Sequence, residues 1–102
     1  MLHMVVATHG PETCAAVVPA VMEKALSGSL RMGEVTKALG ITVLGAWTNM
    51  PGHVLYFLLD APNAHVIHQM AVELHLMDWN TVVVNPVTEL QTAVESIQHH
   101  KP

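Results

Sequence analysis

Two histidines, His9 and His53, and one cysteine, Cys14, are the residues of this chain whose types best suit metal chemistry. The chain carries eight histidines, but only four lysines and arginines and eight aspartates and glutamates. Histidine ligates metals and moves protons near neutral pH. Cys14 is the single cysteine, which excludes an internal disulfide framework and any site built from several cysteines. The chemistry open to this chain therefore depends on whether the fold brings these three side chains together.

The sequence predicts strands and helices in the order β-α-β-β-α-β, followed by a C-terminal helix. Apolar runs bounded by glycine, proline and asparagine predict strands at residues 2–8, 41–48, 53–59 and 81–84. Helical patterns predict helices at 19–26, 31–39, 63–77 and 89–97, with Ser27-Gly28-Ser29 separating the first two. This order is typical of the ferredoxin-like fold, so we expect a single α+β domain over residues 1–102.

The central strands are apolar on both faces, and the chain is short of charge. Residues 54–59 read Val-Leu-Tyr-Phe-Leu-Leu, so one face can pack on the helices while the other needs a second cover. Charged residues make up 12% of the chain, about half of the share usual in a soluble domain. We expect the second cover to be another subunit that lays its sheet on this one, giving a homodimeric α+β barrel.

Composition also excludes several partners. The four basic residues are too few to neutralise a phosphate backbone, so we expect no binding to nucleic acid. No apolar stretch approaches the roughly eighteen residues needed to span a membrane, so we expect no membrane partner. The first residues, Met-Leu-His-Met, lack the pattern of a signal peptide, and the cytoplasm is the expected location.

The predicted topology brings His9 and His53 to one edge of the sheet. Right-handed crossovers would place the third strand between the first and second, antiparallel to the first. The end of the first strand, at His9, then lies beside the start of the third, at His53, and the following loop carries Cys14 to the same edge. Two imidazoles and a thiolate suit nickel, copper or zinc and leave open positions for water or a small-molecule ligand. His75 and Asp78, at the end of the 63–77 helix, are weaker candidate ligands.

Two other interpretations of these residues stay open. In one, His9 lies in a turn, His53 starts a strand at a solvated edge, and Cys14 is a small buried hydrophobe. In the other, Cys14 is an enzyme nucleophile whose thiolate is favoured by a nearby imidazole and a helix N-terminus. His65 and His68 lie on the polar face of a predicted helix, so we expect them to face solvent.

Five short motifs, which together span nearly the whole chain, resemble a known group of proteins. They are Thr8-His9-Gly10-Pro11-Glu12-Thr13-Cys14, Gly45-Ala46-Trp47, Pro51-Gly52-His53, Asp60-Ala61-Pro62 and Asn85-Pro86-Val87. The chain is similar to small stand-alone ferredoxin-like proteins of the dimeric α+β barrel superfamily, a bacterial group of uncharacterised activity related to a nickel-binding group. The resemblance implies a homodimer with a site at the rim or interior of the barrel and with His9 and His53 as the functional pair.

These observations lead to one functional hypothesis and two alternatives. We predict a small homodimeric protein that binds a transition-metal ion for sequestration, sensing or a metal-assisted reaction on a small substrate. The first alternative, which other members of that superfamily suggest, is a monooxygenase or isomerase, metal-free or with haem, acting on a small apolar molecule in the barrel. The second is a non-catalytic structural or interaction dimer. The distance between the imidazoles of His9 and His53 separates the three, because only the metal-binding hypothesis needs them to converge.

Overall fold

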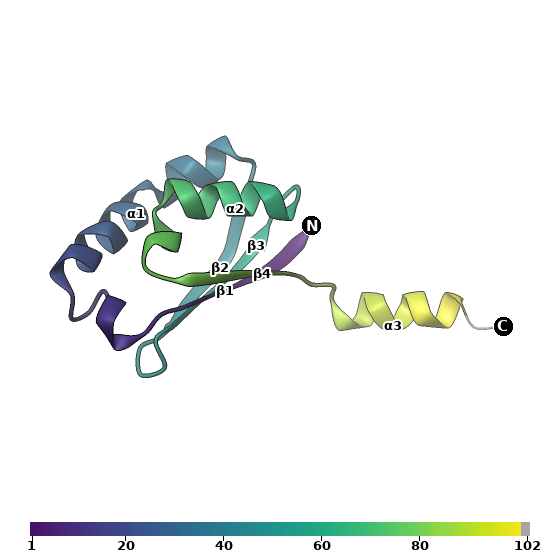
Figure 1. The fold of residues 1–102 in the computed structure, drawn as a ribbon. Helices are drawn as coiled ribbons and strands as arrows, with labels where there is room; N and C mark the ends of the chain where they lie inside the picture. The colour runs from purple at the N-terminus through teal and green to yellow at the C-terminus, as the bar shows by residue number, and fades with distance from the viewer. Residues whose placement is uncertain (101–102) are drawn as a thin grey trace.

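A computed structural model describes residues 1–100 as a four-stranded antiparallel sheet with helices on one of its faces (Figure 1). The elements are β1 (Leu2–Thr8), a short 3-10 helix (Pro11–Thr13), α1 (Pro19–Ala38), β2 (Thr42–Asn49), β3 (Val54–Asp60), α2 (Ala64–Glu73), a 3-10 turn (Leu76–Asp78), β4 (Thr81–Pro86) and α3 (Leu90–His99). The predicted α+β class is therefore confirmed, and the arrangement is compatible with the ferredoxin-like fold. No helix among the described residues is long and apolar enough to cross a membrane.

Strand order decides which residues meet at the sheet edge. The strands lie in the order β2-β3-β1-β4, and every neighbouring pair is antiparallel. β3 thus lies between β1 and β2, and the β1–β3 ladder ends with Thr8 opposite Val54. One step further, the backbone N–H of His9 donates to the carbonyl of His53 at 3.1 Å. This order ties together two positions that are far apart in the sequence.

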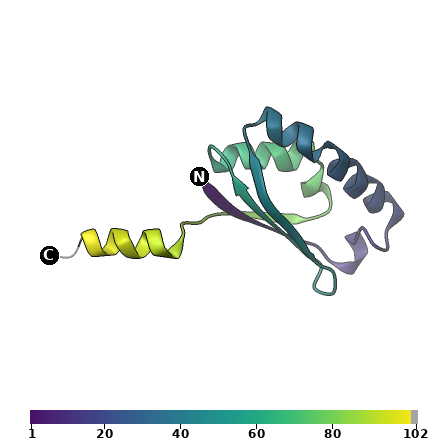
Figure 2. The ribbon, with the colours of Figure 1, turned by 180° about the vertical axis from the view of Figure 1, so that it is seen from behind.

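The core lies between the sheet and the pair α1 and α2, which cover the same face (Figures 1 and 2). Alternate residues of the strands point to opposite faces of a sheet. In β1 this alternation buries His3, Val5 and Ala7 on the helix-covered face. The other main members of the core are Phe57 and Leu59 of β3 and Ile67, Met70, Ala71 and Leu74 around α2.

The opposite face of the sheet, which we call the open face, is apolar and is not covered by any described segment (Figure 2). By the same alternation it carries half-buried side chains of the two central strands and exposed ones of the outer strands. They are Leu2, Met4 and Val6 of β1, Val54, Tyr56 and Leu58 of β3, Trp47 of β2 and Val83 of β4. Trp47 is 56% exposed, which is unusual for so large an apolar side chain.

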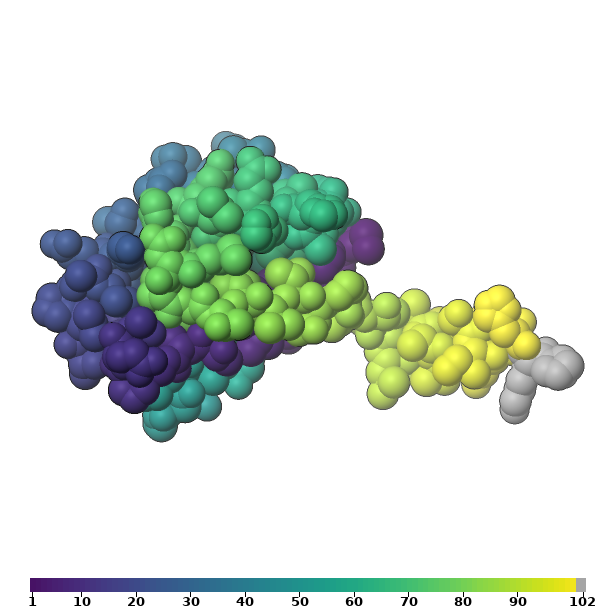
Figure 3. Space-filling model, in the orientation of Figure 1, coloured from purple at the N-terminus to yellow at the C-terminus, as the bar shows by residue number. Residues whose placement is uncertain are grey.

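Helix α3 projects away from the body of the molecule instead of packing on it (Figures 1 and 3). Leu90, Ala93, Val94 and Ile97 recur at helical spacing and form an apolar stripe, yet none of the described residues of α3 is buried. This projecting helix raises the radius of gyration of the chain to 15.7 Å. A compact chain of this length would measure about 13 Å.

Two sequence predictions about the helices were wrong. Ser27-Gly28-Ser29 does not break the first helix, because α1 runs without interruption from Pro19 to Ala38. The helix predicted over 63–77 stops at Glu73, because His75 adopts a left-handed backbone conformation with φ of 57° and a 3-10 turn follows. β4 also extends beyond the predicted 81–84, to Pro86.

Gly28 has a packing role in α1. A Cβ atom at this position would lie 2.9 Å from the carbonyl oxygen of Leu74, where helix α1 passes the end of α2. Gly33, in the same helix, has no such neighbour within 4 Å. Glycine lets the two backbones approach, at the cost of its low helix propensity. The propensity alone predicted a break, and the tertiary contact explains why the helix continues.

We expect Gly28→Ala and Gly33→Ala to change stability in opposite directions. Each alanine gains about 1 kcal/mol of helix propensity. At position 28 the clash with the Leu74 carbonyl, which costs about 1–3 kcal/mol in a packed interior, opposes that gain. Urea unfolding should therefore show a higher free energy of unfolding for Gly33→Ala and a lower one for Gly28→Ala. A stabilised Gly28→Ala variant would contradict the close approach of α1 to Leu74.

Candidate metal centre

The side chains of His9, Cys14 and His53 converge at the edge where β1 ends and β3 begins. One ligand atom from each residue lies within 4.8 Å of the other two. The imidazole centroids of His9 and His53 are 5.3 Å apart, and the rings meet edge to face at 72°. Cys14 is buried, and both histidines are half-buried. The three residues that the sequence singled out therefore form one cluster.

The ring of His9 is oriented by Asn80. Nδ1 of His9 lies 2.9 Å from Oδ1 of Asn80, and Nδ2 of Asn80 donates to the carbonyl of Leu76 at 3.1 Å. Because the amide nitrogen is used for Leu76, the Asn80 oxygen is the acceptor and Nδ1 of His9 is the donor. Nε2 of His9 then carries a free lone pair. Metal-binding histidines are commonly oriented in this way, through a hydrogen bond from the second ring nitrogen.

His53 has a buried nitrogen that the rest of the described chain leaves unpaired. Its Nδ1 atom is inaccessible to solvent and has no hydrogen-bond partner among residues 1–100. A buried polar atom without a partner costs about 1–3 kcal/mol, so such atoms are rare in folded proteins. The His53 backbone is also left-handed, with φ of 56°, a conformation that costs most residues free energy. The left-handed backbone belongs to the turn that the His53 N–H closes on the Met50 carbonyl at 3.3 Å, whereas the unpaired Nδ1 is explained if it binds a ligand.

Cys14 is held in place by the loop between β1 and α1. Its backbone carbonyl accepts hydrogen bonds from the N–H groups of Val17 (3.1 Å) and Val18 (2.9 Å). Its own N–H donates to the carbonyl of Pro11 at 3.4 Å, which closes the 3-10 helix. The side chain is 7% exposed. Backbone contacts, rather than side-chain hydrogen bonds, thus set the position of the thiol beside the two imidazoles.

The weaker candidate ligands, His75 and Asp78, do not join this cluster. They pair with each other at 3.2 Å, and Asp78 accepts a hydrogen bond from Lys24 at 3.1 Å. The Lys24 ammonium, helped by His75, holds the pKa of Asp78 below its ordinary value. The ion pair between Lys24 and Asp78 therefore stabilises the fold while Asp78 is ionised. This small contribution is lost as the pH falls through the lowered pKa of Asp78.

The remaining histidines lie away from the cluster. His65 and His68 are exposed on α2, as predicted, and His99 and His100 are exposed at the end of the described chain. His3 is 1% exposed in the core, where its Nδ1 atom lies 3.1 Å from the carbonyl of Met1. Among the described residues, only His9 and His53 combine with Cys14 into a group of metal-ligating type.

Sequence reasoning brings Trp79 to this edge of the sheet, with the last strand starting there after Asn80, but it gives neither residue a role in the site. Trp79 is 7% exposed, and its ring centroid lies 5.1 Å from that of His9. Both residues precede β4, which pairs with β1 on the side opposite to β3. The only available signal was the expectation that β4 starts at this edge. Neither residue type marks a metal site by itself.

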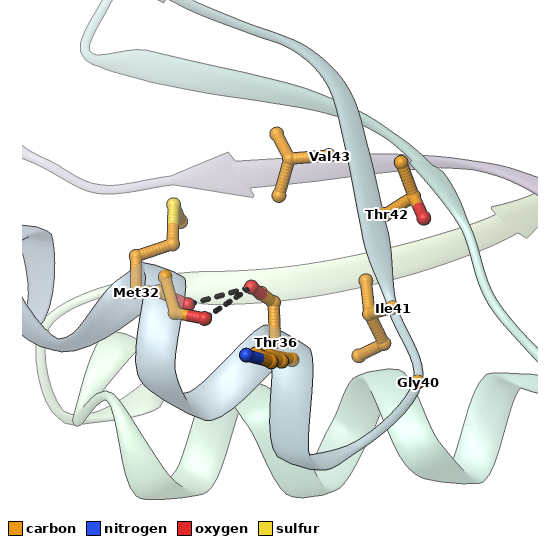
Figure 4. Close-up of a pocket in the computed structure, with 8 residues that line it drawn as sticks. Met32, Thr36, Gly40, Ile41, Thr42 and Val43 are labelled. Carbon is orange, nitrogen blue, oxygen red and sulfur yellow. Dashed lines mark hydrogen bonds between the residues drawn. The ribbon is translucent and has the colours of Figure 1, made fainter.

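A wide hollow elsewhere on the molecule carries less chemistry. It measures 670 Å³ and lies between the C-terminal half of α1 and the start of β2 (Figure 4). The hydroxyl of Thr36 donates to the carbonyls of Met32 (2.7 Å) and Gly33 (3.2 Å), so its own helix already uses it (Figure 4). Lys37 is the one ionisable residue that lines the hollow among those described. The His9–Cys14–His53 cluster is thus the stronger candidate.

Comparison with known proteins assigns no role to the residues of this site. A search with protein-family models and a search of curated proteins returned no match to the chain.

Proposed function

We propose that the chain binds one transition-metal ion through Nε2 of His9, Sγ of Cys14 and Nδ1 of His53. The observation that carries the proposal is the buried Nδ1 atom of His53, which lacks a partner among residues 1–100, in a residue that clusters with His9 and Cys14. Asn80 supports it by leaving Nε2 of His9 free to ligate. A structural role for these residues would not require the unpaired nitrogen.

The spacing of the donor atoms suits a small ion. A tetrahedral site with metal–nitrogen bonds of about 2.0 Å and a metal–sulfur bond of about 2.3 Å separates its donor atoms by roughly 3.3–3.6 Å. In this structure one ligand atom from each of His9, Cys14 and His53 lies within 4.8 Å of the other two. Small changes of side-chain torsion would draw them around an ion. Nitrogen and sulfur donors favour nickel, copper or zinc over magnesium or calcium.

Three protein ligands leave at least one coordination position for another molecule. Sites that keep such a position are typical of catalytic zinc proteins, whereas structural zinc sites use four protein ligands. Among the roles considered, a metal-assisted reaction on a small substrate therefore fits the donor set best. The expected cytoplasmic location suits it too, since a reducing compartment keeps a cysteine as a free thiol.

Metal titration of the untagged protein tests the proposal. After removal of metal with a chelator, we expect nickel, copper, zinc and cobalt(II) each to bind in a ratio of one ion per chain. The cobalt(II) and copper(II) forms should show a thiolate-to-metal charge-transfer band. Cys14→Ser should lose that band. Binding well below one ion per chain, or a wild-type spectrum without the band, would refute the proposed donor set.

Asn80 supplies a second, more specific prediction. Asn80→Leu keeps the size of the side chain but removes the acceptor that orients His9, so we expect the metal affinity to fall about ten- to a hundredfold. Asn80→Asp keeps an acceptor beside Nδ1 of His9 but loses the donor to the Leu76 carbonyl, so its affinity should lie between those of Asn80→Leu and wild type. Competition with a chelator of known affinity measures both. Equal affinities for Asn80→Leu and wild type would show that Asn80 does not orient a ligand.

We also propose that the chain is a homodimer of the dimeric α+β barrel type, with the open faces of two sheets packed together. The open face presents apolar side chains on both central strands, which natural monomers rarely leave in water. The low charge of the chain agrees, since 12% charged residues leave little to cover this surface. A second copy presents the same apolar surface, and a two-fold axis would make the two surfaces self-complementary.

Helix α3 supports a second copy as the partner. A helix of ten residues is marginal in water without tertiary contacts, yet no described residue of α3 is buried. Its apolar stripe therefore needs an apolar surface to pack against; the stripe consists of Leu90, Ala93, Val94 and Ile97. In a dimer of this kind the projecting arm of each subunit can reach the other. Exchange of a terminal element between identical subunits is a common route to dimers.

A further inference from the structure

Two apolar cavities meet beside the candidate metal centre, on the helix-covered side of the sheet. The smaller, of 260 Å³, is lined by His9 and Cys14 themselves. The larger, of 360 Å³, extends from it between α1 and the sheet. Five residues line both cavities, which makes them neighbours in one pocket: Ala15, Ala25, Thr48, Leu55 and Trp79.

The walls of this pocket suit an apolar group. Away from the metal ligands they are mainly alanine, leucine, phenylalanine, methionine and tryptophan. Lys24 lines the larger cavity, but its ammonium is bound to Asp78 at 3.1 Å and half-exposed. Thr48 and Ser29 add two hydroxyl groups. An apolar cavity with few polar groups is the common form of a small-molecule site.

The volume of the larger cavity indicates the size of its guest. At about 30 Å³ for each non-hydrogen atom, the value for liquid water, 360 Å³ holds about twelve such atoms. The guest would pack against Trp79, whose ring also contacts His9. A guest that also enters the smaller cavity reaches His9 and Cys14 with one end, while the rest lies under α1.

We infer that the metal centre takes a small substrate with one metal-binding donor group and an apolar body of about a dozen non-hydrogen atoms. The donor group occupies the open coordination position, and the body fills the cavity between α1 and the sheet. This inference rests on the proposed metal binding. It places the substrate under the helices, on the opposite side of the sheet from the interior of a dimeric barrel.

Ligand binding to the cobalt(II) form tests the inference, with imidazole and 4-phenylimidazole as probes. Both offer the same donor group, and only the second carries an apolar body. We expect wild-type protein to bind 4-phenylimidazole at least tenfold more tightly than imidazole, as followed by the visible spectrum of cobalt. Ala25→Leu and Ala46→Val fill the pocket from α1 and from β2, so each should abolish the preference while cobalt binding persists. Ala20→Leu, on the exposed side of α1, is the matched control and should keep the preference.

Each outcome has a distinct meaning. Cobalt binding with equal affinity for the two probes would overturn the inference and leave the proposed metal binding intact. A preference that survives in both filled variants would also overturn it, because the body would then lie elsewhere. If wild-type protein binds no stoichiometric cobalt, the proposed function fails and the inference fails with it.

Discussion

His9→Ala and His53→Asn are each expected to weaken metal binding by more than about a hundredfold, because loss of a ligand exceeds the ten- to hundredfold loss typical of residues that only orient one. Asparagine is the better replacement at position 53, where φ is 56°, because it tolerates the left-handed conformation better than alanine does. Chelator competition against nickel or zinc measures the loss. Circular dichroism of each variant establishes that the fold is kept.

The matched controls are His65→Ala and His68→Ala. These two histidines lie one helical turn apart on the exposed face of α2 and would account for adventitious metal binding by a histidine-rich chain. We expect both variants to bind one ion as tightly as wild type. A loss of binding in the controls, with His9→Ala and His53→Asn unaffected, would move the site to α2 and contradict the proposal.

Val6→Lys is expected to convert the proposed dimer into monomers. Val6 lies on the open face of β1, directly opposite Tyr56 of β3, so it is near the middle of the proposed interface. Each dimer would bury two ammonium groups without partners, and the dissociation constant should rise by roughly a thousandfold. Sedimentation at micromolar concentration should show wild type at twice the chain mass of 11.1 kDa and the variant at the chain mass itself.

Val72→Lys provides the control for this experiment. Val72 is 50% exposed on α2, on the side of the molecule that faces away from the open sheet. The same substitution there should leave the dimer intact. Wild-type protein that sediments as a monomer, or Val6→Lys protein that remains dimeric, would contradict packing through the open face.

Local sequence signals placed the end of every strand to within two residues and were insufficient for the helix ends. β1 matched its prediction at residues 2–8, because apolar residues bounded by His9-Gly10-Pro11 leave little ambiguity. In α1, by contrast, the low propensity of Gly28 predicted a break. Its contact with the Leu74 carbonyl belongs to another part of the chain, and no local pattern carries it. The end of α2 depends on the left-handed backbone conformation of His75, and the spacing of apolar residues in the sequence does not reveal that conformation either.

The residues of the candidate site were predictable, but their surroundings were not. His9, Cys14 and His53 were identified by type and by the expected meeting of two strand ends. Asn80 and Trp79 lie about seventy residues after His9 in the sequence, and neither type is characteristic of metal sites. The hydrogen bond from His9 to Asn80 and the unpaired Nδ1 of His53 follow from side-chain positions alone.

The sequence by itself determined the α+β class, the apolar character of both sheet faces and the three residues able to ligate a metal, because residue type and periodicity are local properties. The tertiary structure decided that these residues converge, that they lie under the helices, and that an apolar pocket adjoins them. Such features depend on contacts between β1, β3, α1 and the start of β4. Contacts between distant segments arise only when the whole sheet is assembled, so no stretch of sequence encodes them alone.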